Sequence, residues 1–172
     1  LQVRRLRQRQ MVIRDSYNTA IGMHALTTTV SGEQNTAVGY ESLANNTAHF
    51  NTAMGFQALE TNTTGSNNTA LGHNAMDVNT TGANNTAVGS QSLGALTTGG
   101  ANTAMGHHAL LVSTTGDRNV AVGHEAGDTI ATGVKKTCVG DVAGGACTTG
   151  STCTVLGYSD QTAAVAARTH ST

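Results

Sequence analysis

The pentapeptide Asn35-Thr36-Ala37-Val38-Gly39 decides the fold of this chain, because close copies of it return along most of the sequence. An earlier copy is Asn18-Thr19-Ala20-Ile21-Gly22. Later copies, the last three of them degenerate, end at Gly55, Gly72, Gly89, Gly106, Gly123, Gly140 and Gly157. These nine closing glycines are 17 residues apart, except for one step of 16 residues between Gly39 and Gly55. Such a short fixed period predicts a repeat architecture.

A second motif, Thr-Thr-Gly, keeps the same phase as the first. Its glycine stands seven residues before a closing glycine, at Gly65, Gly82, Gly99, Gly116, Gly133 (where Ala131 replaces the first threonine) and Gly150. One 17-residue repeat has room for two strands of about five residues and two tight turns. Coils about 4.8 Å apart would form a rod of about 40 Å over eight steps. The repeat therefore predicts an all-β fold, a parallel β-solenoid of about nine coils.

Composition excludes several functional classes. Aromatic residues make up 3% and charged residues 11% of the chain, both low for an enzyme with a large core. The chain has no proline, which fits continuous strand ladders. The net charge is −1, and no run is long and apolar enough for a transmembrane helix. We therefore expect neither nucleic-acid binding nor membrane insertion.

The chain divides into a basic stub (1–15), a repeat array (16–160) and a short tail (161–172). Val3, Leu6, Gln10 and Ile13 follow the spacing of a coiled-coil seam, so the stub could be the end of a helical stalk. A disordered basic lead-in, or a segment whose arginines dock on an acidic partner, fits equally well. No signal peptide is visible, and the first residue is Leu, which indicates a piece of a longer or processed chain.

Two apolar columns recur through the repeats. The residue before the closing glycine is always aliphatic or Met, which predicts an interior position. This column comprises Ile21, Val38, Met54, Leu71, Val88, Met105, Val122, Val139 and Leu156. A second interior column is expected four residues after the glycine, at Leu26, Leu43, Leu59, Met76, Leu93 and Leu110. It lapses at Gly127, Gly144 and Gln161.

Small and polar columns complete the repeat. Alanine stands two residues before the glycine in seven consecutive copies, from Ala20 to Ala121, which suggests close approach of another backbone. Because two apolar columns make a thin core, we expect copies of the chain to pack together as a homotrimer. The asparagines from Asn18 to Asn119 can stack their amides from coil to coil, and the Thr-Thr-Gly turns are expected to face solvent.

The position after the closing glycine varies, which suits a surface that contacts a partner. It holds Tyr40, Phe56, His73, His107, His124 and Tyr158. Rings in this column could bind a glycan or a protein. His107 and His124 could share an ion, although an exposed, variable column without a ligand explains them as well.

The cysteines Cys138, Cys147 and Cys153 are not spaced like a zinc site. They are either buried thiols or include a disulfide near the C-terminus.

Signs of catalysis are missing from the sequence. Glu41, Glu60, Asp77 and Glu125 are scattered singly, and the glycines follow the repeat rather than a phosphate-binding loop. We therefore expect no enzyme activity, no cofactor and no metal.

The pattern Asn-Thr-Ala-Val-Gly-x-x-x-Leu followed by Thr-Thr-Gly resembles the head repeats of trimeric autotransporter adhesins. It resembles still more closely the repeat arrays in tail fibres and appendages of bacteriophages. The resemblance covers residues 16–160 and implies a left-handed β-roll with three chains around one axis. It also implies attachment to a host-surface glycan or protein, at the virion surface or outside the cell. The step of 16 residues, with Asn46-Thr47-Ala48 in place of Thr-Thr-Gly, puts local regularity in doubt.

Three further roles stay open. Regular Thr and Asn columns could order water in an ice-binding solenoid, although Thr-Thr precedes a turn glycine and so lies partly at a corner. The head of a bacterial surface adhesin and a purely structural virion component are the other two.

Overall fold

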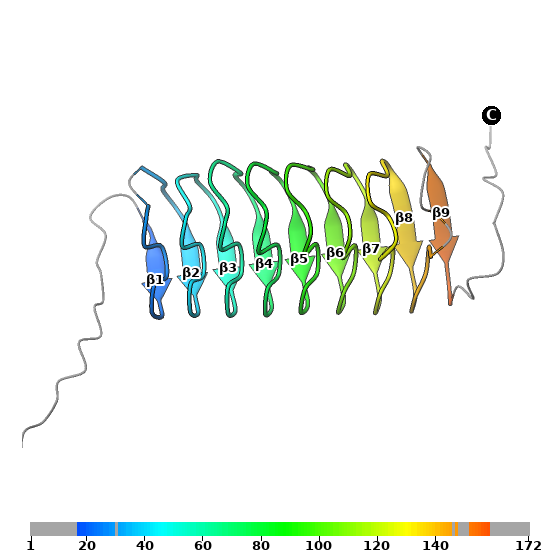
Figure 1. Ribbon diagram of the computed structural model, residues 1–172, viewed down its shortest axis with the longest axis horizontal. Helices are drawn as coiled ribbons and strands as arrows, with labels where there is room; N and C mark the ends of the chain where they lie inside the picture. The colour runs from blue at the N-terminus through cyan, green and yellow to red at the C-terminus, as the bar shows by residue number, and fades with distance from the viewer. Residues whose placement is uncertain (1–16, 30, 146, 148–151, 159–172) are drawn as a thin grey trace, which may run out of the picture.

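A computed structural model describes residues 17–29, 31–145, 147 and 152–158. Their fold is a parallel β-solenoid of about eight turns, because eight parallel pairings connect nine strands in sequence order (Figure 1). The strands are β1 (Thr19–Ile21), β2 (Thr36–Val38), β3 (Thr52–Met54), β4 (Thr69–Leu71), β5 (Thr86–Val88), β6 (Thr103–Met105), β7 (Val120–Val122), β8 (Lys136–Val139) and β9 (Cys153–Leu156). Each coil is named below after its strand.

The described residues contain no helix, and so none that could cross a membrane. The stub and nearly all of the tail lie outside the described residues, so the expected coiled-coil seam at Val3, Leu6, Gln10 and Ile13 stays a prediction.

The strands pair in strict register, so equivalent residues lie side by side along the rod. Ala37 pairs with Ala53, and Ala53 pairs with Ala70. The 16-residue step between Gly39 and Gly55 therefore leaves the strand register unchanged. In this shortened coil the carbonyl of Ala48 accepts hydrogen bonds from the amides of Asn35 and Asn46, at 2.8 and 2.9 Å. The shortening is confined to one corner of the coil.

Each strand ends at a closing glycine, where only glycine fits. Gly89 has a φ of 127°, and a Cβ added to it would lie 2.5 Å from the carbonyl oxygen of Gly106 in the next coil. The same arrangement recurs at the other closing glycines up to Gly140. A side chain at this position would therefore push neighbouring coils apart, which explains why the glycine recurs in every coil.

The expected second strand is absent from the described coils, and a turn takes its place. Residues two and four places after the closing glycine have positive φ angles, as in Gln91 (56°) and Leu93 (51°). Left-handed residues cannot continue a strand, so the chain bends inward there. Gly127 and Gly144 stand at the second of these positions with φ angles of 63° and 90°. The leucine column is thus interrupted by glycine, which adopts the same positive φ angle with less strain than a leucine.

The interior holds one of the two expected apolar columns. Leu26, Leu43, Leu59, Met76, Leu93 and Leu110 are fully buried, as predicted. The prediction for the residues before the closing glycine is wrong, because Ile21, Met54, Leu71, Met105 and Leu156 are exposed. The remaining members, Val38, Val88, Val122 and Val139, are half-buried and lie on the same outward side. Side chains alternate between the two faces of a strand, so this column and the residue two places earlier point outward, while the alanine between them points inward.

The alanine column lines the coil's own interior, so the prediction that it meets another backbone is also wrong. Ala37, Ala53, Ala70, Ala87, Ala104 and Ala121 have no exposed surface. A Cβ added at Gly127, in the leucine column, would lie 3.7 Å from the Cβ of Ala121. The two columns therefore face each other across the coil, and the leucines leave room only for a methyl group on the strand.

The asparagine column forms a continuous buried ladder, as predicted. From Asn35 onward, each backbone N–H donates to the side-chain oxygen of the asparagine in the preceding coil, as when Asn85 N–H donates to Asn68 Oδ1 at 2.9 Å. From Asn51 onward, each side-chain amide nitrogen donates to the carbonyl of the glycine 14 residues later, as when Asn85 Nδ2 donates to Gly99 O at 2.9 Å. The ladder therefore ties the start of each strand to the turn that leads into the next strand, at the same corner of the rod. The Thr-Thr pairs face solvent, and Thr63 and Thr64 are exposed.

Candidate functional site

The first candidate interaction surface is the outer sheet face, defined as the outward side chains of β1 to β9. It consists of the column before the closing glycine and a parallel column two residues earlier. The second column comprises Thr19, Thr36, Thr52, Thr69, Thr86, Thr103, Val120, Thr137 and Thr154. Ile21 is 60% exposed and Leu71 46% exposed, which leaves large aliphatic groups in contact with solvent.

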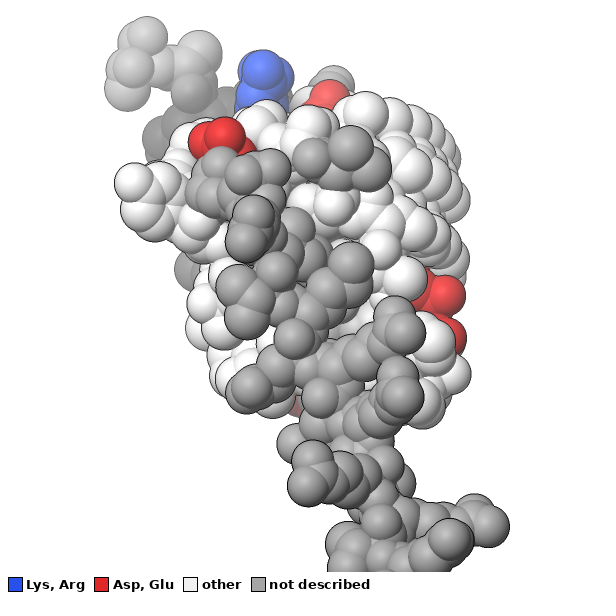
Figure 2. Space-filling model, turned by 90° about the vertical axis from the view of Figure 1, so that its left-hand side faces the viewer, with Lys and Arg blue, Asp and Glu red and all other residues white. Residues whose placement is uncertain are grey.

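Charge is absent from this face. The strands contain one charged residue, Lys136, whose side chain is buried inside the coil. Viewed from the β1 end, the molecule shows few Asp, Glu, Lys or Arg side chains among the described residues (Figure 2). Three residues of strand span about 10 Å and eight coil steps about 40 Å, so the face is a strip of about 400 Å². A largest patch of this size is usual on a monomer and is often functional, and here the aliphatic column runs beside a column of threonines.

The second candidate surface is the ring stripe after the closing glycine, predicted at Tyr40, Phe56, His73, His107, His124 and Tyr158. The structure stacks neighbouring rings of this column. The centroids of Tyr40 and Phe56 lie 5.1 Å apart, and those of Phe56 and His73 lie 5.4 Å apart. Ring faces that cover one another are not free to stack on a sugar. Only ring edges and the ends of each stack therefore remain for a ligand.

The stripe is interrupted in the β5 coil, where Ser90 stands at the ring position. A second stack begins beyond it, and the rings of His107 and His124 lie 5.4 Å apart and nearly parallel. Tyr158 is 74% exposed and sits at the far end of the array. Tyr40 also hydrogen-bonds to Glu41, which raises the pKa of the phenol.

A network of imidazoles and carboxylates surrounds the second stack. His124 Nε2 lies 3.7 Å from Glu125 Oε1, and His124 Nδ1 lies 3.1 Å from Asp141 Oδ1. His108 Nδ1 lies 3.9 Å from the same Glu125 oxygen. The ring centroids of His107 and His108 are 3.6 Å apart. His124 thus pairs with carboxylates, and the described residues contain no group of three or more His, Cys, Asp or Glu that could hold a metal ion.

Sequence reasoning missed the partners in this network. Asp141 belongs to the ring column itself, whereas His108 and Glu125 belong to the next position along the chain. Stacking of the coils also brings close together acidic residues that lie far apart in the sequence. Desolvation raises the pKa of Glu60, and the neighbouring carboxylates of Glu41 and Asp77 raise it further. A period of 17 predicts that equivalent positions align, and comparing adjacent columns coil by coil would have found these contacts.

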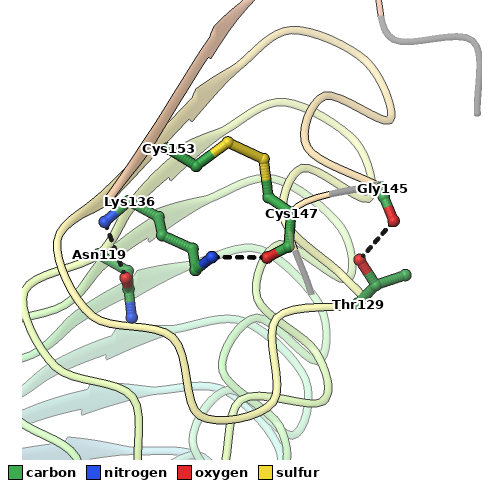
Figure 3. Close-up of a disulfide and its surroundings, with 6 residues drawn as sticks. All are labelled: Asn119, Thr129, Lys136, Gly145, Cys147 and Cys153. Carbon is green, nitrogen blue, oxygen red and sulfur yellow. Dashed lines mark hydrogen bonds between the residues drawn. A yellow bond between two sulfur atoms is a disulfide. The ribbon is translucent and has the colours of Figure 1, made fainter. Parts of the chain in front are cut away.

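The C-terminal coils replace the asparagine ladder with other chemistry (Figure 3). Lys136 takes the asparagine position in β8, where its backbone N–H donates to Asn119 Oδ1 at 3.0 Å. Its Nζ donates to the carbonyl of Cys147 at 2.7 Å. Lys136 is 1% exposed, and this burial lowers the pKa of its ammonium group.

The cysteines divide between the two alternatives that the sequence left open. Cys147 and Cys153 form a disulfide, and Cys138 is a buried free thiol. Cys138 occupies the alanine column, where burial raises the pKa of its thiol. Comparison of the chain with protein-family models, curated proteins and solved structures found no match.

Proposed function

We propose that this chain is a structural and adhesive segment of a fibre, which assembles as a parallel homotrimer through the outer sheet face. The fibre would belong to a bacteriophage tail fibre or virion appendage that attaches to a host surface. The observation that carries the proposal is the exposed aliphatic column on a rigid, uncharged strip of nine strands. The repeat resemblance supports the same assembly and a left-handed β-roll.

The occupant that best suits the outer sheet face is another copy of the chain. An identical face repeats its side chains at the same coil spacing, so threonines and aliphatic groups can interlock along the whole rod. No like charges oppose each other, because no charged side chain points outward from the strands. A single flat contact of about 400 Å² falls short of the roughly 800 Å² per partner of a standard stable interface. A third chain does not enlarge the strip, so the choice of a trimer over a dimer rests on the repeat resemblance.

Analytical ultracentrifugation tests the assembly. We expect the protein to sediment as three times its 17.5 kDa chain mass. The double variant Leu71→Lys/Met105→Lys places two charges in the aliphatic column and should yield monomers. A matched control, Thr64→Lys/Thr98→Lys, adds the same charge at exposed corner positions and should remain trimeric. A folded wild-type monomer at micromolar concentration, or a trimer that survives both variants, would contradict the proposal.

Immuno-electron microscopy tests the attachment role. Gold-labelled antibody against the repeat array should decorate rods that project from virions. Label restricted to bacterial surfaces would instead favour the adhesin head. Label confined to the cell interior would refute a role in surface attachment.

One observation favours ice binding as a second candidate. The outward threonine column places eight hydroxyl groups on a flat sheet at regular coil spacing. A thermal-hysteresis assay separates the candidates. Activity that is lost in Thr69→Leu/Thr86→Leu would favour ice binding, whereas no hysteresis would favour the fibre.

A further inference from the structure

A notch interrupts the side of the rod in the β5 coil. Its floor is formed by Gly94 and Ala95, and its volume is about 380 Å³. The β4 coil carries Asp77 and Val78 at the equivalent positions, and the β6 coil carries Leu111 and Val112. The notch, called here the Gly94 notch, therefore arises because two small residues lie between larger ones. It lies on the turn side of the coil, away from the outer sheet face.

The backbone does not require glycine at this position. Gly94 lacks the positive φ angle that distinguishes the closing glycines. Its N–H donates to Gln91 O at 3.1 Å, and Leu111 makes the same turn bond to His108 O at 3.1 Å. A leucine thus adopts the same turn one coil away. Glycine here lets the Leu111 side chain approach the backbone, because a Cβ at Gly94 would lie 3.1 Å from Gln91 O and 3.2 Å from Cδ1 of Leu111.

The lining combines apolar walls with a polar rim. Val78 and Val112 are 38% and 41% exposed, which leaves methyl groups in water on both sides of the notch. Asp77 and Gln91 provide the polar atoms. Asn74 Nδ2 holds Asp77 Oδ2 at 3.0 Å. Small-ligand sites typically show this mixture of apolar surface and a few fixed polar groups.

The rim groups select the class of ligand. A carboxylate accepts hydrogen bonds from hydroxyl groups, and the primary amide of Gln91 can donate or accept. Gln91 is itself oriented by a contact of 2.6 Å between its Oε1 and His108 Nε2. An aromatic ligand would remove water from Asp77 without replacing its hydrogen bonds. An acidic ligand would be repelled by Asp77.

We infer that the Gly94 notch binds one neutral hexopyranose ring, with the apolar face of the ring against Val78, Leu111 and Val112. The hydroxyl groups of the ring hydrogen-bond to Asp77 and Gln91. This inference rests on the proposed adhesive function, for which it supplies a receptor class and a contact site. A trimer would present three such notches, so weak single sites would gain strength through multivalency.

Methyl NMR on the intact chain, with labelled Val and Leu methyl groups, tests the inference. The probes are the methyl glycosides of glucose, galactose and mannose, with methyl glucosaminide and methyl glucuronide as cationic and anionic comparisons. At least one neutral glycoside should shift the signals of Val78, Leu111 and Val112, with a dissociation constant in the millimolar range because one ring makes few contacts. The glucuronide should cause no shift.

Two variants and a control locate the site. Gly94→Leu/Ala95→Val copies the residue pair of the β6 coil, so it should fold while filling the notch and abolishing binding. Asp77→Asn should weaken binding about tenfold, because a charge-assisted hydrogen bond is replaced by a neutral one. Thr129→Val changes the residue equivalent to Ala95 in the β7 coil, where its hydroxyl bonds only to Gly145 O, and should leave binding unchanged.

The outcomes separate this inference from the proposed function. Three results would each overturn the sugar site. The filled variant shows the same methyl shifts as the wild type, only a charged glycoside (the glucuronide or the glucosaminide) binds, or no neutral glycoside shifts the methyl signals. Sedimentation and electron microscopy of the filled variant would still report on the fibre. Conversely, a monomeric wild-type chain would overturn the fibre, while the methyl shifts would still report on the notch.

Discussion

The buried asparagine ladder predicts a large and specific loss of stability for Asn85→Ala. Asn85 is 1% exposed. Its Nδ2 donates to Gly99 O at 2.9 Å and to Asn68 Oδ1 at 3.2 Å. Its Oδ1 accepts from the backbone N–H and the side-chain Nδ2 of Asn102, at 2.9 and 3.1 Å. Removing this side chain breaks all four of these bonds.

The magnitude follows from the groups that lose their partner. Asn102 Nδ2 keeps a bond to Gly116 O at 2.7 Å, and Asn68 Oδ1 keeps the bond from the Asn85 backbone. Two backbone groups, Gly99 O and the N–H of Asn102, lose the side-chain partner that holds them. At about 1–3 kcal/mol for each unsatisfied buried group, Asn85→Ala should cost about 2–6 kcal/mol.

Asn85→Asp separates lost hydrogen bonds from lost packing, because it keeps the size of the side chain. The carboxylate still accepts from Asn102 but cannot donate to Gly99 O, and it faces Asn68 Oδ1. Burial favours the protonated form, so folding should raise the pKa of this new carboxyl group. Stability is then lost as pH rises through the folded-state pKa and recovered toward pH 4. The free-energy gap to the wild type should therefore narrow in acid.

Urea unfolding followed by circular dichroism, at one protomer concentration throughout, measures these effects. Asn18→Ala is the matched control, because Asn18 has the same role in the half-buried β1 coil, where water can replace its bonds. The control should cost less than about 1 kcal/mol. The reasoning fails if Asn85→Ala lowers the free energy of unfolding no more than the control does. It also fails if Asn85→Asp is less stable than the wild type by the same free energy at pH 4 and pH 7.

Three further perturbations test other parts of the coil. Gly89→Ala should cost more than about 3 kcal/mol in urea unfolding, because it adds a collision to an unfavourable φ, whereas Gly94→Ala should change stability by less than about 0.5 kcal/mol. Asp128→Asn should stabilise the protein at pH 7 and flatten the fall in melting temperature as pH rises from 4. Desolvation, followed by the charge of Glu125, raises the pKa of Asp128, so the folded state favours its protonated form; an unchanged pH profile would contradict this. Cys147→Ser/Cys153→Ser should lower the free energy of unfolding by about 2 kcal/mol, the loop-entropy value for a separation of six residues, and reductant should then have no further effect.

Periodicity predicted much of this fold, because it fixes which residues share a column. It gave the parallel stack, the closing glycines, the buried leucines and the asparagine ladder. It could not decide which face of the strand points inward. Thr86 and Val88 share one face while Asn85 and Ala87 share the other, and hydropathy alone favours burying the valine. Volume reverses that choice, because Leu93 from the turn already fills the coil and leaves space for only a methyl group.

The candidate surfaces were less predictable than the fold. The ring stripe followed from its column, but its stacking shows that rings contact each other rather than offering open faces. The contacts of His108 and Glu125 depend on how neighbouring columns lie at the turn, which a period does not specify. The Gly94 notch depends on the absence of side chains in a single coil. A repeat pattern that averages over coils conceals such a local exception.

The disulfide takes over a connection that hydrogen bonds make elsewhere in the solenoid. Before β3, Asn51 Nδ2 donates to Asn46 Oδ1 at 3.2 Å. This corner thereby joins the asparagine before the strand to the residue seven places after the preceding closing glycine. Cys153 and Cys147 occupy these two kinds of position near the end of the array.

A ladder is stabilised by the coils on both sides, so its last members are the weakest, and terminal repeats often depart from the consensus. A covalent bond at this corner does not depend on a following coil. We therefore expect hydrogen exchange after reduction to rise first in β9 and β8, and uniform exchange along the rod would show that the disulfide has no capping role.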